Sequence, residues 1–204
     1  MEIAEPIGSL SLLILYLSGW FPDWEEDFRT SHSNLTFVLL TMSALSWCRP
    51  WEVNGQFFVH PAWIGFLIIF FGLGHKLSAD SIFPLFGRSF CTGTLFLFLH
   101  ELMKANADWT YRPFQFVLFC GVIFLSYLIS GRLSERIWYT GMCLMILHVW
   151  ILFFYRERLN PFVLGSEAFM DTLWLVLIGI LFMHFLEKWI WIRVMKKSSG
   201  TGHN

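Results

Sequence analysis

Residues 137–155 read IWYTGMCLMILHVWILFFY, a run without aspartate, glutamate, lysine or arginine. A helix that crosses a bilayer needs about 20 consecutive apolar residues, so this segment is long enough to do so. The whole 204-residue chain has the same character, with 56% hydrophobic, 19% aromatic and only 14% charged residues and a mean hydropathy of +0.58. Ordinary soluble domains contain about 25% charged residues. The composition therefore predicts a multi-pass integral membrane protein and argues against a soluble enzyme or a disordered chain.

Seven apolar runs can be marked along the chain. They cover residues 7–21, 33–48, 61–75, 81–103, 113–130, 137–155 and 169–192. Because no water reaches the bilayer core to pair with backbone groups, we expect each run to be a helix rather than a strand. The first and third runs are short, so six spans fit the sequence as well as seven. The sequence predicts an all-α bundle of six or seven transmembrane helices in one domain, residues 1–204, with a polar tail over about 195–204.

Two of the runs have features that bear on topology. The first run follows Glu2 and Glu5 rather than a basic stretch, which favours a retained span over a cleaved signal peptide. The fourth run contains Pro84 and Gly87, so we expect it to break, with a longer helix beginning near Ser89. A break of this kind is typical of transporters, whose discontinuous helices line a site near the bilayer midplane.

The distribution of lysine and arginine between the connections predicts the orientation of the bundle. One side would carry Arg49, Lys104, Arg112, Arg156 and Arg158, and the other Arg29, Lys76, Arg132, Arg136, Lys188, Arg193, Lys196 and Lys197. The excess on the second side predicts a cytoplasmic C-terminus. On that side Arg132, Glu135 and Arg136 form a compact charged turn, which we expect to be a solvated loop. The net charge of −1 offers no basic surface for nucleic acid, so the expected partners are the lipid bilayer, a lipid substrate and other membrane proteins.

A few ionisable residues inside the runs are candidates for function, since a charge at the bilayer centre costs roughly 2.5–3.5 kcal/mol. His100 lies near the end of the fourth run, His148 in the middle of the sixth, and His184 and Glu187 on one face of the seventh. His148, His184 and Glu187 could ligate a metal, and the three histidines could bind a haem or a quinone. The alternative is that each imidazole hydrogen-bonds to a neighbouring helix or lies at the headgroup level.

The second run opens on Thr30-Ser31-His32-Ser33-Asn34-Leu35. This segment resembles the T-x-x-S-N-L signature at the start of a span in bacterial membrane proteins related to the androgen-induced-protein family. Members of that family have about six spans and are intramembrane hydrolases that cleave lipid esters with a threonine nucleophile and a distant histidine. The resemblance implies that Thr30 is the nucleophile and that His100, at the end of Leu97-Phe98-Leu99-His100, is the base that takes its proton.

The resemblance covers two short segments and departs from the family pattern at two positions. Lys104 stands where the family usually has a proline after the histidine, and Arg29 replaces an aromatic residue before the threonine. The alternative interpretation of the Thr30 segment is a helix N-cap, because threonine and serine hydroxyls accept the free N–H groups of a first turn.

A protein without enzymatic activity is the other class that fits this sequence. It would be a transporter, with the proline-containing fourth run as its discontinuous helix, or a scaffold subunit of a larger membrane complex. The 23 phenylalanines suit packing against lipid or partner subunits. The sequence leaves the hydrolase, the transporter or scaffold, and the haem or quinone protein open.

Overall fold

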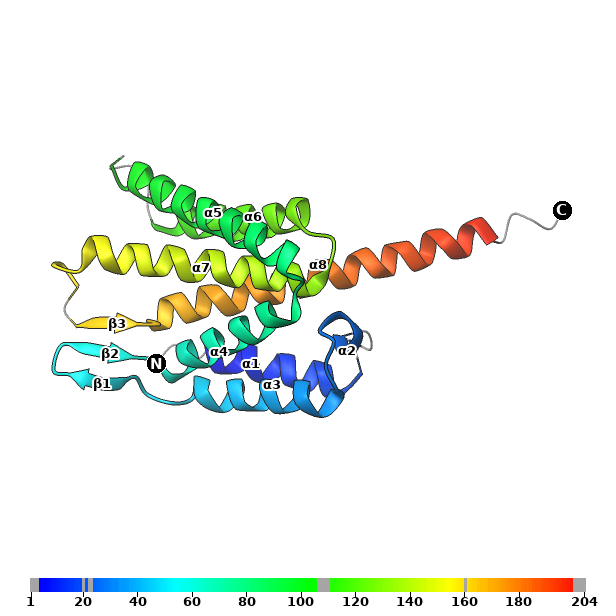
Figure 1. Ribbon diagram of the computed structural model, residues 1–204, viewed down its shortest axis with the longest axis horizontal. Coiled ribbons are helices and arrows are strands. Elements are labelled where there is room, and N and C mark those ends of the chain that lie inside the picture. The colour runs from blue at the N-terminus through cyan, green and yellow to red at the C-terminus, as the bar shows by residue number, and fades with distance from the viewer. Residues whose placement is uncertain (1–3, 20, 22–23, 106–110, 160, 200–204) are drawn as a thin grey trace.

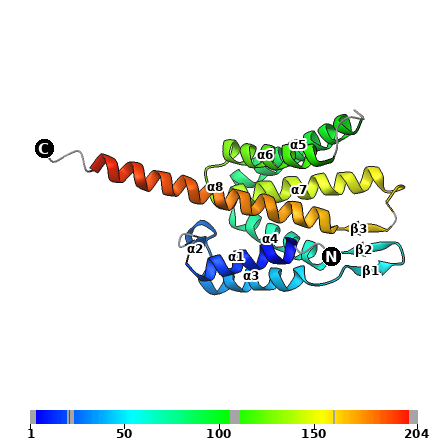
Figure 2. The same cartoon turned by 180° about the vertical axis from the view of Figure 1, so that it is seen from behind.

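The computed structural model describes residues 4–19, 21, 24–105, 111–159 and 161–199. Over these residues the chain forms α1 (Ala4–Leu17), α2 (Trp24–Asp27), α3 (His32–Ser46), β1 (Trp51–Asn54), β2 (Phe57–Val59), α4 (Pro61–Lys76), α5 (Ala79–Ala105), α6 (Tyr111–Ile129), α7 (Leu133–Tyr155), β3 (Phe162–Leu164) and α8 (Glu167–Ser199). The long helices form one bundle, with the strands at one end and α2 at the other (Figure 1). α8 continues past the end that carries α2, as the view from behind also shows (Figure 2).

Each of the seven predicted runs is a helix, and the runs correspond in order to α1 and to α3 through α8. Three helices in the described part of the chain are long and apolar enough to cross a membrane: Asp80–Ala105, Leu133–Tyr155 and Glu167–Trp191. Pro61–Lys76 and Phe114–Ile129 are apolar but shorter. α1 has 14 residues and α3 has 15, so each is only about 21–23 Å long, against a hydrocarbon core of about 30 Å. The several apolar helices fit a membrane protein, and the predicted count of six or seven spans is not confirmed.

α5 runs unbroken from Ala79 to Ala105, so the predicted break at Pro84 and Gly87 is wrong. Pro84 lies in the second turn, where it removes only the hydrogen bond to the carbonyl of Asp80. Asp80 is exposed at the start of the helix, where solvent can satisfy this carbonyl. α5 therefore lacks the discontinuity that a transporter was expected to show there.

A three-stranded sheet, which the apolar runs did not predict, lies at the end of the bundle opposite α2 (Figure 1). β1 and β2 pair antiparallel as a hairpin, and β2 pairs parallel with β3, which precedes α8. The hairpin has a local signal, because Asn54-Gly55 is a favoured turn dipeptide and aromatic residues flank it. The sheet joins the connection after α3 to the connection after α7.

α7 is the central helix and packs against α4, α5, α6 and α8. Its contact with α4 depends on Gly141, where a Cβ atom would overlap the ring of Phe70. Beside it, Trp138 donates a hydrogen bond from Nε1 to the carbonyl of Phe70 at 2.9 Å. Its contact with α5 has the same character, because a Cβ on Gly93 would lie 2.9 Å from the carbonyl oxygen of Cys143. Small residues at both interfaces let the helix backbones approach closely.

Replacing Gly141 tests this close approach. We expect Gly141→Ala to lower the free energy of unfolding by about 1–3 kcal/mol, since overpacking forces neighbouring side chains out of place. Phe70 is only 1% exposed, so its ring would have to shift within the protein interior to admit the methyl group. The matched control is Gly87→Ala on α5, where a Cβ meets nothing within 4 Å and alanine should raise stability by up to about 1 kcal/mol. Chemical unfolding in detergent, followed by circular dichroism, is the measurement, and equal effects of the two changes would contradict the packing.

His60 connects the sheet to the start of α4. The residue is 3% exposed, its backbone N–H donates to the carbonyl of Leu164, and its Nδ1 accepts from the N–H of Ala62. Burial lowers the pKa of this imidazole, and the carboxylate of Glu167 opposes that shift only in part. The folded protein therefore favours neutral His60, the form that can accept the hydrogen bond from Ala62.

This pKa shift makes the stability of the fold depend on pH. Because the unfolded chain takes up the proton more readily, His60 contributes stability above about pH 6.5 that is lost as the pH falls. We expect His60→Asn, which keeps a side-chain acceptor at the start of α4 but does not titrate, to reduce the loss of thermal stability between pH 7.5 and pH 5. Thermal unfolding of wild type and variant at both pH values is the measurement. The same pH dependence in both proteins would rule out a contribution from His60.

Candidate functional site

Basic side chains gather at the end of the bundle that carries α2. Lys76, at the end of α4, has its Nζ 3.4 Å from the carbonyl oxygens of both Phe28 and Arg29. Arg29, Lys76 and Arg132 line one cavity at this end. All three belong to the side on which the sequence placed more lysines and arginines. The structure therefore places these three basic residues around one cavity. The cytoplasmic position of the C-terminus stays a prediction.

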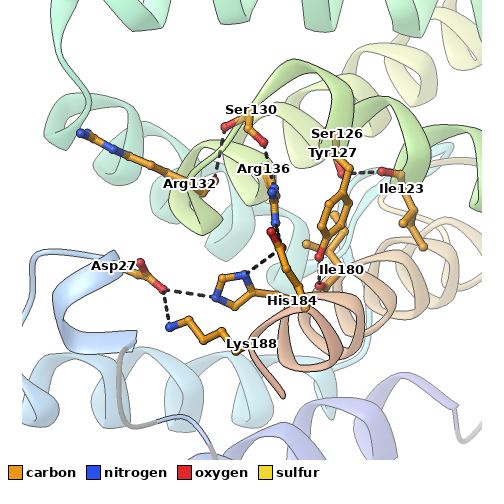
Figure 3. Close-up of polar contacts among 11 residues, drawn as sticks. Asp27, Ile123, Ser126, Tyr127, Ser130, Arg132, Arg136, Ile180, His184 and Lys188 are labelled. Atoms are coloured by element: carbon orange, nitrogen blue, oxygen red, sulfur yellow. Dashed lines mark hydrogen bonds and ion pairs between the residues drawn. The ribbon is translucent and has the colours of Figure 1, made fainter. Parts of the chain in front are cut away.

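Arg136 is 4% exposed, so the expectation of a solvated charged turn is wrong for this residue. Its Nε donates to the carbonyl of Ser130 at 2.9 Å, and its Nη1 donates to Oε2 of Glu187, also at 2.9 Å (Figure 3). The guanidinium carbon lies 3.7 Å from the centre of the Tyr127 ring. Arg136 is buried because it lies in the first turn of α7, on the side that faces α6 and α8. One guanidinium thus connects three helices.

A second group of contacts connects α2 to α8 beside Arg136 (Figure 3). His184 has Nε2 3.6 Å from Oδ2 of Asp27 and Nδ1 3.9 Å from Oε2 of Glu187, and Nζ of Lys188 lies 4.0 Å from the same Asp27 oxygen. These distances suit ion pairs and are too long for direct hydrogen bonds. Asp27 Oδ2 and both ring nitrogens of His184 are buried without a hydrogen bond inside the described part of the chain.

The structure does not bring His148, His184 and Glu187 together as a metal site. His148 packs against Phe169 at the start of α8, with ring centroids 4.0 Å apart, whereas His184 lies about 22 Å further along that helix. His148 Nε2 accepts from the N–H of Gly165 at 3.0 Å. Across the described residues, no group of three or more histidine, cysteine, aspartate or glutamate side chains could hold a metal ion.

The structure also separates Thr30 from His100. Thr30 precedes α3 and lines a cavity together with Lys76, whereas His100 lies about 30 Å along α5 from its start at Ala79 and lines another cavity. α5 begins at the α2 end of the bundle and runs toward the sheet end (Figure 1). The residue that caps α3 is Ser31, and it makes no side-chain capping bond. The proposed nucleophile and its base are therefore not within hydrogen-bond reach.

Two adjoining cavities occupy the α2 end of the bundle. The first, of about 320 Å³, is almost entirely apolar and has walls from α1, α3, α4, α7 and α8. The second, of about 310 Å³, is polar and is bounded by the α2 turn and by the connections before α5 and α7. Phe28, Leu73 and Lys76 line both. An apolar space thus opens beside a charged one at one end of a membrane-type bundle.

The polar cavity has three basic and three acidic side chains, from Arg29, Lys76, Arg132, Glu26, Asp27 and Glu135. Two of the carboxylates already have partners: Asp27 has His184 and Lys188, and Glu135 accepts from the Ser130 hydroxyl at 2.7 Å. By contrast, neither guanidinium lining the cavity forms an ion pair with another residue in the described part of the chain. The cavity lining is therefore balanced in charge, and its two guanidiniums offer N–H donors that no ion pair within the described residues uses.

Arg29 also has an unusual backbone conformation. Its φ is +48°, in the left-handed region, which a non-glycine residue enters at a cost of about 1–3 kcal/mol. The turn it makes directs the carbonyls of Phe28 and Arg29 toward Lys76. Backbone strain of this kind is frequent at ligand sites. No motif in the sequence marks Arg29, Lys76 and Arg132 as a site, and their common side in the lysine and arginine distribution is the one signal that points to them.

Comparisons of the chain with protein-family models, with curated proteins and with solved structures found no match in any of the three. The likeness to the androgen-induced-protein family therefore stays a prediction from two short segments. The function has to be argued from the cavities and the side chains that line them.

Removing the buried guanidinium tests its structural role. We expect Arg136→Gln to lower the free energy of unfolding by about 2 kcal/mol, because charged hydrogen bonds to Ser130 and Glu187 are lost. Arg136→Lys should recover only part of this, since an ammonium group cannot reproduce the guanidinium's fork of donors or its stacking on Tyr127. The matched control is Arg132→Gln, an exposed arginine four residues away, with an expected effect within about 0.5 kcal/mol. Urea unfolding in detergent gives the free energy of unfolding of all three variants. An unchanged stability of Arg136→Gln would contradict a structural role for this guanidinium.

Proposed function

We propose that the α2 end of the bundle binds a single-chain membrane amphiphile, with its chain in the apolar cavity and a phosphate-bearing headgroup in the polar cavity. The observation that carries this proposal is that the two cavities share Phe28, Leu73 and Lys76. An amphiphile needs an apolar space and a polar space in direct contact. Lysine is suited to the boundary between them, because its stem packs on apolar surface while its ammonium group reaches polar surroundings.

The cationic donors of the polar cavity favour phosphate over an uncharged headgroup. Arg29 and Arg132 offer planar forks of N–H donors that match phosphate oxygens, and Lys76 adds a third cation. The volume of the apolar cavity, about 320 Å³, is at the small end of ligand pockets. A single acyl chain suits this volume better than two chains.

The proposal is one of binding and includes no ester cleavage. Thr30 lines the apolar cavity near the boundary, but the histidine that the family resemblance implies as its base lines a different cavity. The side of the bundle that is richer in lysine and arginine is predicted to be cytoplasmic. We therefore propose that this site lies at the cytoplasmic leaflet. The protein would then hold or present a phosphate-bearing amphiphile in the membrane.

Binding of lysophosphatidic acid to the detergent-purified protein tests the proposal. Monoacylglycerol with the same acyl chain is the matched ligand, since it lacks only the phosphate. We expect the phosphate-bearing lipid to bind at least about tenfold more tightly, because charge-assisted hydrogen bonds are roughly twice as strong as neutral ones. Microscale thermophoresis over a lipid titration gives both affinities. Equal affinities would contradict a phosphate site.

Variants locate the binding. Lys76→Gln and Arg132→Gln should each weaken binding of lysophosphatidic acid about tenfold and leave monoacylglycerol unaffected. The control is Lys104→Gln, a cation that lies over the ring of Tyr155, far from both cavities of the α2 end. If Lys104→Gln weakens binding as much as Lys76→Gln does, the attraction is a general effect of charge and the site is wrong.

A further inference from the structure

A third cavity, of about 250 Å³, lies at the sheet end of the bundle, between α5, α6, α7 and the start of α8. None of the described residues that line it is an aspartate, glutamate, lysine or arginine. His100 and His148 both line it, and they come from α5 and α7. Aromatic rings of Phe114 and Phe169 contribute to its walls. An apolar space with a few placed polar groups is the usual form of a small-molecule site, and here the ligand would be uncharged.

Hydrogen bonding fixes the tautomer of His148. Its Nε2 accepts from the N–H of Gly165 at 3.0 Å, so a neutral ring must carry its proton on Nδ1. The side chain is 6% exposed, and within the described residues this Nδ1–H has no acceptor. This nitrogen is not fully enclosed by protein, and His148 is one of the residues that line the cavity. His148 therefore offers one hydrogen-bond donor to a ligand.

His100 offers the complementary group. Its Nδ1 lies 3.1 Å from Oε1 of Glu101, and a carboxylate in that position holds the imidazole proton on Nδ1. The hydroxyl of Tyr155 donates to the same carboxylate oxygen and keeps it in place. In the neutral ring Nε2 is then a lone-pair acceptor, and it has no partner in the described part of the chain. The cavity thus has one donor and one acceptor on two different helices.

We propose that this cavity binds the ring of a hydroquinone, the reduced form of a quinone. One ring hydroxyl would donate to Nε2 of His100, and the other would accept from Nδ1–H of His148. A quinone has two carbonyl acceptors, so it can pair with His148 but leaves the lone pair of His100 facing another acceptor. The geometry therefore favours the reduced ring. A haem is excluded as the occupant of His148, because Gly165 already uses the Nε2 lone pair.

The test compares three ligands of one shape on the intact protein in detergent at pH 8, where free imidazole is neutral. They are tetramethylhydroquinone, tetramethylbenzoquinone and tetramethylbenzene. The quinone has no unsubstituted ring carbon to which the exposed cysteines could add. Titrations are done without oxygen and followed by NMR of protein labelled with [¹⁵N]histidine. We expect the affinity to fall about tenfold from hydroquinone to quinone and further to the hydrocarbon, as hydrogen bonds are lost.

Two histidine variants assign the contacts. His100→Leu should remove the preference for hydroquinone over quinone, and His148→Phe should weaken both about tenfold while tetramethylbenzene binds as before. His184→Gln, at the opposite end of the bundle, is the control and should change none of the three affinities. Tighter binding of the quinone, equal binding of all three ligands, or a preference that survives His100→Leu would overturn the proposal. If His148→Phe does not fold, the ligand series on wild type and His100→Leu still decides it.

This proposal is independent of the amphiphile site. Lys76→Gln, which should weaken lysophosphatidic acid binding at the α2 end, should leave hydroquinone binding unchanged. A loss of both ligands in that variant would overturn the assignment of two separate sites.

Discussion

The close contact of α7 with α4 and α5 is the constraint on which the rest of the structure depends. Gly141 and Gly93 allow this approach, and polar groups pair across the interface of α7 with α5. The hydroxyl of Tyr139 donates to Thr92 at 2.8 Å, and Ser89 donates to the carbonyl of Tyr139 at 3.2 Å. In a bilayer, where packing replaces the hydrophobic drive between helices, such contacts determine which helices are neighbours.

Both candidate sites follow from the position of α7. Its first turn carries Arg136, which holds α8 through Glu187 and the end of α6 through Ser130, next to the charged cavity. Further along the same helix, His148 reaches the cavity at the sheet end. A buried arginine requires this full set of partners, because an uncompensated guanidinium in an apolar bundle would cost several kcal/mol. The polar contacts of Arg136 therefore fix how α6 and α8 lie around the charged end.

The helices could be predicted from the sequence, whereas the contacts between them could not. Apolar runs predict each helix, because length and hydropathy are local properties. Thr30 and His100 looked compatible as a pair, since nothing local states that α5 carries His100 away from the α2 end. The burial of Arg136 was missed for the same reason: its neighbours Arg132 and Glu135 indicate a solvated turn, and its partner Glu187 lies on another helix. The break predicted at Pro84 was wrong because a helix tolerates proline near its start, and Pro84 lies in the second turn of α5.

The two ends of the bundle differ in a way that the helices alone do not explain. At the α2 end, charged side chains of both signs surround a cavity, whereas the described residues that line the cavity at the sheet end carry no charged side chain. The sheet accounts for this second environment. Gly165, which follows β3, has φ of +75°, and a Cβ there would lie 2.5 Å from Cβ of Trp63, so this turn requires glycine. The same residue gives its N–H to His148 and so determines which ring nitrogen faces the cavity. A short strand outside the apolar runs thus sets the chemistry of a site inside the bundle.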